Sequence, residues 1–510
     1  MKKLLLFGLS LVLFTACSSD DDLTPQTEIP QGEGNVQLQS EVNDFIWRGM
    51  NHWYFWQSDV ADLADDRFAD TDELHTYLNG FSSSEGLFDE LVFEPGVTDD
   101  FSWYIDDVDA QLNAFRGISE SYGMGLGFLV RTSAETEDVV IYVTFVTPNS
   151  PADAAGIERG DLIYKVDGTV MNTTNFDVIN NVFRNTSVTL GFGSFVDNVF
   201  IPEPNDIPLT AELITSNPIQ HFEVLEEGGR KIGYLVYNGF RATFHGELND
   251  VFESFRNEGI DELILDLRYN GGGSVLTSAF LASMINGNVP EDNDAVARLQ
   301  YNDKRDADNG VVFPFFDDIS LFDKTTSEFL SREPAVRLTN IDRLYIITTT
   351  RTASASEIMI NGLRPFMPVI TIGETTVGKN EGSITVVDAP ASGNSDPFTD
   401  FDNRNPNHNI GMQPIVFQVF NNNNESDYTF GFEPEVLVEE FRFAQDIRPF
   451  GDPDEALLRA TLDHMLGNTA KNARVQPNRS VSKMKDGALK QPRFGSEMYM
   501  LPGEMESLKQ

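Results

Sequence analysis

The sequence predicts a multidomain α/β protein, and three stretches of contrasting pattern carry this prediction. Residues 41–116 repeat apolar and aromatic side chains at helical spacing, which is typical of a small helical domain. Residues 117–200 are rich in glycine and β-branched side chains, which predicts a domain built of short strands. From residue 201 to 467, buried strands alternate with helices, and such alternation predicts a layered α/β core.

The first 40 residues predict export rather than folded structure. Two lysines precede an apolar run, so residues 1–16 are similar to a signal peptide, and the run is too short to cross a bilayer as a folded helix. Cys17 follows at once, which resembles the lipobox of bacterial lipoproteins. A lipidated Cys17, with residues 17–40 as a flexible tether, would anchor the protein at the outer membrane of a bacterial cell envelope, on its periplasmic or surface side. A plain secretory signal with an incidental cysteine is the alternative.

The charge balance limits the partners. The chain carries 80 acidic and 36 basic residues, a net charge of −44. This excludes nucleic acid, because little positive charge is available to neutralise phosphates. The single cysteine excludes an internal disulfide, and the six histidines are scattered without the spacing of a zinc site. We therefore expect neither a metal nor another cofactor.

A glycine-rich loop marks a peptide-binding domain. Gly125, Leu126, Gly127 and Phe128 open a predicted strand, and SPADAAGIERGDLIYKVDG follows at residues 150–168. Together the two patterns resemble a PDZ domain. The N–H groups of such a loop can hold a peptide carboxylate, and the adjoining strand edge can accept an added strand. The apolar side chains of the loop predict a preference for free, apolar C-termini. Alternatively, the glycines serve only a tight turn, or the domain only gates another site.

Two segments after neighbouring strands predict a catalytic pair. Ser354 begins a predicted helix (354–363) after one strand, and Lys379 lies in a glycine-flanked loop after the next strand, at 369–372. Such a unit can bring a serine nucleophile and a lysine base together at one sheet edge. Two alternatives stand beside this hypothesis. Ser354 could merely cap the helix through its S-x-x-E pattern, and His245 could replace the lysine as base.

The loop DLRYNGGG (residues 266–273) predicts half of an oxyanion hole. Three glycines after a buried strand allow backbone N–H groups to point at one place, and we favour Gly272 as the donor. The N–H of Ala355 would be the other half. A phosphate-binding loop is the alternative, but the required G-K-[ST] does not follow. A simple strand-to-helix turn also fits.

The PDZ block, DLRYNGGG, SASE and GETTVGK, in this order, resemble the C-terminal processing, or tail-specific, serine peptidases. The resemblance implies a crotonase-like catalytic core with an inserted PDZ domain, protein or peptide substrates and a metal-free mechanism, in which Ser354 is the nucleophile and Lys379 the general base. The family often has a glutamine four residues after this lysine, where the chain has Ser383.

This departure leaves the third catalytic residue open. It also keeps a rival hypothesis alive, namely a catalytically inactive peptide-binding lipoprotein on the same scaffold. A simple PDZ adaptor is a weaker rival, because the α/β core has no place in it. Residues 468–510 are polar and poor in aliphatic side chains, which predicts a disordered or weakly structured tail.

Overall fold

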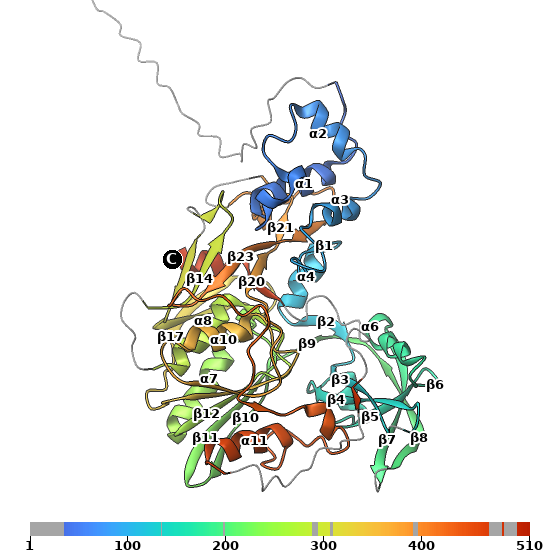
Figure 1. Ribbon diagram of the computed structural model, residues 1–510, viewed down its shortest axis with the longest axis vertical. Coiled ribbons are helices and arrows are strands. Elements are labelled where there is room, and N and C mark those ends of the chain that lie inside the picture. The colour runs from blue at the N-terminus through green and yellow to red at the C-terminus, as the bar shows by residue number, and fades with distance from the viewer. Residues whose placement is uncertain are drawn as a thin grey trace, which may run out of the picture.

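The computed structural model describes most of the chain, namely residues 35–133, 135–196, 199–287, 294–306, 310–390, 396–468, 482–483 and 497–509. The predicted signal peptide and Cys17 lie outside these residues. Within them, no helix has the length and apolar character needed to cross a membrane. Figure 1 shows three parts: blue N-terminal helices at the top, a teal β-rich domain at the lower right and an α/β core at the lower left.

The N-terminal part is helical, as the sequence predicts, and side chains cap its helices. Its elements are α1 (Glu41–Trp53), η1 (Gln57–Asp59), η2 (Ala61–Leu63), α2 (Thr71–Leu78), α3 (Ser84–Leu91), β1 (Trp103–Ile105) and α4 (Val108–Phe115). Ser40 Oγ accepts a hydrogen bond from the N–H of Asn43 at 3.2 Å, which satisfies one of the orphan donors of α1. Strand β1 pairs with β22 (Gly411–Gln413), which joins this part to the core.

The glycine-rich block forms the second part, with a core of its own. Its strands are β2 (Ile118–Ser121), β3 (Met124–Arg131), β4 (Val139–Val146), β5 (Leu162–Val166), β6 (Thr169–Val170), β7 (Ser187–Val196), β8 (Val199–Thr210) and β9 (Glu212–Thr215); its helices are α5 (Pro151–Ala154), η3 (Phe176–Asn180) and α6 (Asn181–Arg184). A dipeptide strand far along the chain, β25 (Ser482–Lys483), pairs with β3 at the edge of this sheet, which has the order β25-β3-β4-β5-β7-β8.

A six-stranded sheet of order β10-β11-β12-β18-β19-β24 organises the α/β core. Its strands are β10 (Ile219–Glu227), β11 (Arg230–Tyr237), β12 (Glu262–Asp266), β18 (Leu344–Thr348), β19 (Val369–Gly373) and β24 (Val436–Leu437). All neighbours after the antiparallel β10–β11 pair are parallel. Successive side chains alternate between two hydrophobic clusters, one beneath α7 (His245–Glu258) and the other beneath α11 (Ala456–Met465). The predicted alternation of strands and helices is confirmed.

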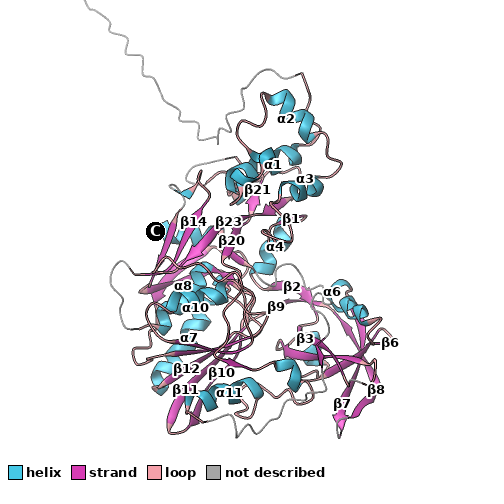
Figure 2. Cartoon of the chain, in the orientation of Figure 1, coloured by secondary structure: helices cyan, strands magenta, loops and turns pink. Residues whose placement is uncertain are grey.

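A second six-stranded sheet lies beside the first, as the magenta arrows of Figure 2 show. Its strands, in spatial order, are β13 (Gly273–Ser274), β26 (Met498–Met500), β20 (Glu381–Ile384), β23 (Ile415–Phe420), β14 (Ala295–Tyr301) and β15 (Val311–Pro314). Around it are α8 (Val275–Ile285), α10 (Ala355–Leu363), the hairpin β16 (Asp318–Phe322) with β17 (Phe329–Pro334), β21 (Val386–Val387), η4 (Ala242–Phe244), η5 (Phe401–Asn403) and η6 (Glu440–Phe443).

The C-terminal segment differs from the predicted weakly structured tail. Residues 498–500 form β26, a strand inside the second sheet, and α12 (Pro502–Lys509) follows it. The physical reason is a run of four apolar side chains at residues 498–501, all buried, which is long enough to fill one strand position although the surrounding composition is polar. Residues 469–481 and 484–496 lie outside the described part of the chain.

Candidate active site

Ser354 stands at a sharp turn between β18 and α10. Its backbone has φ of 63°, a left-handed conformation that costs a residue with a Cβ roughly 1–3 kcal/mol. The side chain is fully buried, and its Oγ has no hydrogen-bond partner. A strained strand-to-helix turn that leaves a serine hydroxyl unengaged is the local geometry of a nucleophile.

Glu357 ties this turn to the lysine loop. Its Oε2 accepts hydrogen bonds from the N–H groups of Ser354 at 2.7 Å and Lys379 at 2.9 Å. Its Oε1 accepts from the hydroxyl of Thr376 at 2.6 Å and the N–H of Gly378 at 2.7 Å. One buried carboxylate therefore holds the backbones of both predicted catalytic residues. Burial raises the pKa of Glu357 to about 7, against the four hydrogen bonds, which lower it.

The same contacts bear on the capping alternative. The Glu357 carboxylate accepts the N–H of Ser354, and the Ser354 side chain faces the backbone of Glu357 as in a capping box, but the Ser354 hydroxyl makes no hydrogen bond of normal geometry there. Ser356 behaves differently, because its Oγ donates to the carbonyl oxygen of Asn270 at 2.9 Å. Ser354 is thus the unengaged serine of the pair, and Ser356 is held by the neighbouring loop.

Lys379 is fully buried at the end of the loop that follows β19. Its Nζ lies 2.7 Å from Oε2 of Glu497 and 4.2 Å from the ring centre of Phe101. Burial raises the pKa of the Glu497 carboxyl, and Lys379 opposes that shift. The lysine therefore reaches the predicted site but faces a carboxylate from the C-terminal segment in this conformation, while Ser354 Oγ stays without a partner.

The glycine-rich loop of the core, DLRYNGGG at residues 266–273, passes directly over Ser354. A Cβ placed on Gly272, whose φ is +120°, would come within 2.8 Å of the Ser354 Cβ and 2.6 Å of the Glu497 carbonyl oxygen. No side chain fits there. The N–H of Gly272 donates to Oδ1 of Asn270 at 2.9 Å, and the N–H of Gly273 donates to the Glu497 carbonyl oxygen at 2.5 Å.

Asn270 and Ala355 complete the surroundings of Ser354. The Asn270 carbonyl accepts from the N–H of Ala353 at 3.2 Å, and its side-chain amide donates to the Tyr237 carbonyl at 2.8 Å, so Asn270 joins the glycine-rich loop to two strands' ends. Ala355 is the first residue of α10, and N–H groups in the first turn of a helix have no intrahelical acceptor. The structure thus brings Ser354, Lys379, Gly272 and Ala355 together.

His245, the alternative base, is engaged elsewhere. Its Nδ1 lies 2.7 Å from the Ser320 carbonyl oxygen, and its Nε2 lies 2.7 Å from Oγ1 of Thr277. Burial lowers the pKa of this imidazole to about 4. Both ring nitrogens therefore serve the packing of α7, and neither contacts Ser354.

Ser383, which stands where the family often has a glutamine, contacts a different glutamine. Gln413 from β22 donates to Ser383 Oγ at 2.9 Å, and Ser383 Oγ donates to the Met498 carbonyl oxygen at 3.2 Å. Both side chains are fully buried. In the described residues, no group of three or more His, Cys, Asp or Glu side chains could hold a metal ion.

A buried cluster of charged side chains packs beside the glycine-rich loop of the core. The sequence analysis did not predict it. The Arg268 guanidinium, with no exposed surface, donates to Asp266 at 2.7 Å, Glu455 at 2.7 Å and Glu440 at 3.0 Å. Burial acts to raise the pKa of Glu440, but Arg159 and Arg268 hold it down at about 2. The available signal was an Asp-x-Arg pair at the end of an otherwise apolar strand.

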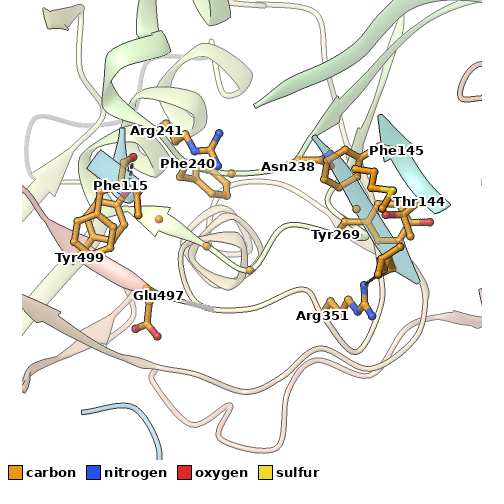
Figure 3. A pocket seen from close by; sticks show the side chains of 18 of the residues that line it. Phe115, Thr144, Phe145, Asn238, Phe240, Arg241, Tyr269, Arg351, Glu497 and Tyr499 are labelled. Atoms are coloured by element: carbon orange, nitrogen blue, oxygen red, sulfur yellow. Dashed lines mark hydrogen bonds between the residues drawn. The ribbon is translucent and has the colours of Figure 1, made fainter. Parts of the chain in front are cut away.

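A cavity of about 280 Å³ lies between the glycine-rich loop of the core and the PDZ-like loop. Figure 3 shows Glu497 and Tyr499 on one side of it, with Tyr269 and Arg351 on the other. Arg351 reaches from the core to the carbonyl oxygens of Leu126 and Gly127, the second at 2.6 Å, and covers the ring of Phe128 at 4.6 Å. Gly125 and Leu126 line the cavity, whereas Phe128 packs against η6.

Known families match all three parts of the chain. Residues 231–392 match the profile described as Peptidase family S41, residues 41–103 the Peptidase S41 N-terminal domain and residues 118–191 the PDZ domain. A crystal structure of an S41 protease from Bacteroides fragilis superposes with a TM-score of 0.62 at 25% sequence identity, over 83% of this chain and 97% of that one.

Two curated relatives are processing proteases. A carboxyl-terminal-processing protease of Synechocystis sp. is 27% identical over 50% of this chain and 52% of its own length. The chloroplastic carboxyl-terminal-processing peptidase 2 of Arabidopsis thaliana is 25% identical over 51% of this chain and 45% of its own. The chain thus spans about half the length of the curated relatives that it matches.

Fold, site and similarity agree on the class of domain: residues 231–392 form a Peptidase family S41 domain, which follows an S41 N-terminal domain and a PDZ domain. Within that class, the chain is similar to the carboxyl-terminal-processing peptidases. The predicted resemblance and the predicted multidomain α/β fold are confirmed.

Proposed function

We propose that this protein is an endopeptidase that cleaves unfolded or C-terminally recognised proteins of the cell envelope by a Ser-Lys mechanism. Ser354 Oγ attacks the substrate carbonyl carbon while neutral Lys379 takes the hydroxyl proton. The N–H groups of Ala355 and Gly272 stabilise the oxyanion. Lys379 then gives its proton to the leaving amine, and water, activated by the same lysine, hydrolyses the acyl-enzyme.

One observation supports this proposal above the others, namely the Glu357 carboxylate that accepts the N–H groups of both Ser354 and Lys379. A purely structural helix cap would leave the lysine loop elsewhere. The Gly272 N–H must leave Asn270 Oδ1 to reach an oxyanion, so a small movement of the loop accompanies substrate binding. Catalytic hydrogen bonds are commonly long or misaligned in the free enzyme and shorten only when substrate is bound.

Cleavage of unfolded casein and labelling by a fluorophosphonate probe test the function. Wild-type protein should do both, Ser354→Ala neither, and Ser356→Ala should keep measurable activity, because the Ser356 hydroxyl only bonds to Asn270. A correctly folded wild type that neither cleaves nor labels would favour the rival, a peptide-binding lipoprotein without chemistry. Ser383 in place of the family's glutamine keeps that rival in view.

The PDZ domain is proposed to select substrates with free, apolar C-termini. Gly125, Leu126, Gly127 and Phe128 supply the loop, and the cavity that joins this loop to the glycine-rich loop offers a route to Ser354. Titration of paired free-acid and amidated peptides by fluorescence anisotropy separates carboxylate capture from gating. Equal affinities would leave the domain as a gate.

Envelope anchoring through Cys17 is a proposal from the sequence, as are the domain limits at residues 40, 116, 200 and 467. Lipidation of Cys17 would hold the chain on a membrane surface, with no nucleic acid and no metal among its partners. Cell fractionation of Cys17→Ala tests the anchor, since unchanged membrane association would contradict it.

A further inference from the structure

The C-terminal segment of the chain lies in the proposed active site. Strand β26 pairs in parallel with β13, at the end of the glycine-rich loop, and with β20, just after Lys379. The carbonyl oxygen of Glu497 accepts the N–H of Gly273 at 2.5 Å and lies, like Ser354, against Gly272. A carbonyl group of the chain itself therefore stands where a substrate carbonyl would meet this loop.

The Glu497 side chain also engages the proposed base. Its carboxylate lies 2.7 Å from Nζ of Lys379, with both side chains buried. An ammonium group has three donors and no acceptor, so a lysine held in this ion pair cannot take a proton from Ser354. The unpartnered Ser354 Oγ is consistent with a base turned away from it.

Glu497 lines two cavities. One is the cavity of about 280 Å³ on the PDZ side, and the other, of about 620 Å³, lies beside the N-terminal part and is lined by Asp99, Phe101 and Trp103. Because Glu497 lines both, removal of the segment would join them into one path that passes Lys379, whose Nζ lies against Phe101. An extended peptide needs such a path.

The same stretch of chain reaches the PDZ edge. Ser482 and Lys483 pair antiparallel with Arg131 and Val130 of β3, the strand that continues from the glycine-rich PDZ loop. Addition of a strand at this edge is how PDZ domains take peptides. The chain direction also fits, because β25 runs from the far end of β3 toward Phe128.

We propose that residues 497–500 are an internal peptide ligand, which fills the substrate strand position at β26 and must leave before a substrate is cut, while residues 482–483 lie on the PDZ edge at β25. This inference rests on the proposed function. It also defines the substrate class, which is an extended segment that pairs between β13 and β20. The −44 net charge does not oppose it, since these contacts are backbone pairing and one local ion pair.

The test measures the rate of fluorophosphonate labelling in the full-length protein, in Glu497→Gln and in a chain that ends at residue 496. If the segment fills the site in about nine molecules of ten, the shortened chain labels about tenfold faster than the full-length protein. Glu497→Gln should fall between the two, because it frees the lysine but keeps the strand. A synthetic peptide of residues 497–510 should then slow the shortened chain again, with saturation.

A matched control uses a second carboxylate of the same segment. Glu504 accepts from the hydroxyl of Ser274 and the N–H of Leu501, away from Lys379, so Glu504→Gln should label at the full-length rate. If the shortened chain does not fold, judged by thermal unfolding, Glu497→Gln and this control decide. Equal, measurable labelling of all proteins would overturn the inference alone. Absence of labelling and of casein cleavage in every protein would overturn the proposed function instead.

Discussion

Two buried polar clusters lie one loop apart, and they are built in opposite ways. In the first, each guanidinium nitrogen of Arg268 donates to a carboxylate, and the backbone around it is relaxed. In the second, Glu357 holds the backbones of Ser354 and Lys379, yet the Ser354 hydroxyl has no partner and its φ is +63°.

The difference teaches how to tell a structural cluster from a reactive one. Buried polar groups are nearly always paired, and the Arg268 cluster obeys this rule completely. An unpaired buried hydroxyl on a strained backbone persists only where the surrounding structure imposes it. Here that structure is provided by Glu357. Its carboxylate accepts four hydrogen bonds and holds in place the backbone of Ser354, whose hydroxyl has no hydrogen-bond partner.

The largest expected effect is on the proposed base. Lys379→Arg should lower kcat/KM for a casein-derived peptide by at least about 10⁴-fold, because a guanidinium stays protonated at any usable pH. Its folding stability should change little, since arginine can keep the ion pair with Glu497. Retained activity in this variant would show that the reactive cluster works without lysine as base.

The structural cluster should respond in stability rather than in chemistry. Arg268→Met leaves buried carboxylates without their cation and should lower the free energy of unfolding by about 3–5 kcal/mol, measured by urea denaturation. Arg256→Met is the matched control, because Arg256 pairs with Glu253 on the exposed face of α7 and such pairs contribute about 0–1 kcal/mol. Equal losses in both variants would erase the contrast between the clusters.

A smaller effect is expected at Glu357, the carboxylate that holds the backbones of Ser354 and Lys379. There, activity and folding stability should respond differently. Glu357→Gln keeps the volume but exchanges an acceptor for a donor, so kcat should fall about 100-fold through misplacement. In the wild type, with the Glu357 pKa raised to about 7, protonation below that pH removes acceptor capacity, and activity should fall.

The sign for folding is the opposite. A carboxyl whose folded pKa lies above its unfolded value takes up a proton on folding between about pH 7 and 4.5. Its contribution to stability therefore grows as the pH falls through this window. Parallel pH profiles of activity and of the urea midpoint check the divergence. In Glu357→Gln, the pH dependence between about pH 7 and 4.5 should be absent from both the activity profile and the urea-midpoint profile.

The sequence predicts much of the site because its parts are local. Ser354 and Lys379 each follow a buried strand, and parallel strand ends gather at one edge, so neither fold nor pairing required distant information. Glu357 was visible in S-x-x-E, but the pattern indicates a helix cap and not a contact with a loop 22 residues on.

Contacts between distant segments were out of reach. Two of the three partners of Arg268, Glu440 and Glu455, lie 172 and 187 residues away, and Glu497 lies 118 residues from Lys379. No periodicity connects such positions. The C-terminal strand was missed for a different reason, since composition averaged over the 43 residues from 468 to 510 hides a run of four apolar ones.

One aromatic pair gives the C-terminal strand a wider reach. Tyr499 stacks on Phe115, with ring centres 3.8 Å apart, and its hydroxyl donates to the Phe115 carbonyl at 3.3 Å. Phe115 ends α4, the helix that leads from the N-terminal part into the PDZ domain. Thermodynamic linkage is reciprocal. A partner that binds α4 and shifts it must therefore change the affinity of the site for β26. By the same factor, the departure of β26 must change the affinity of α4 for that partner.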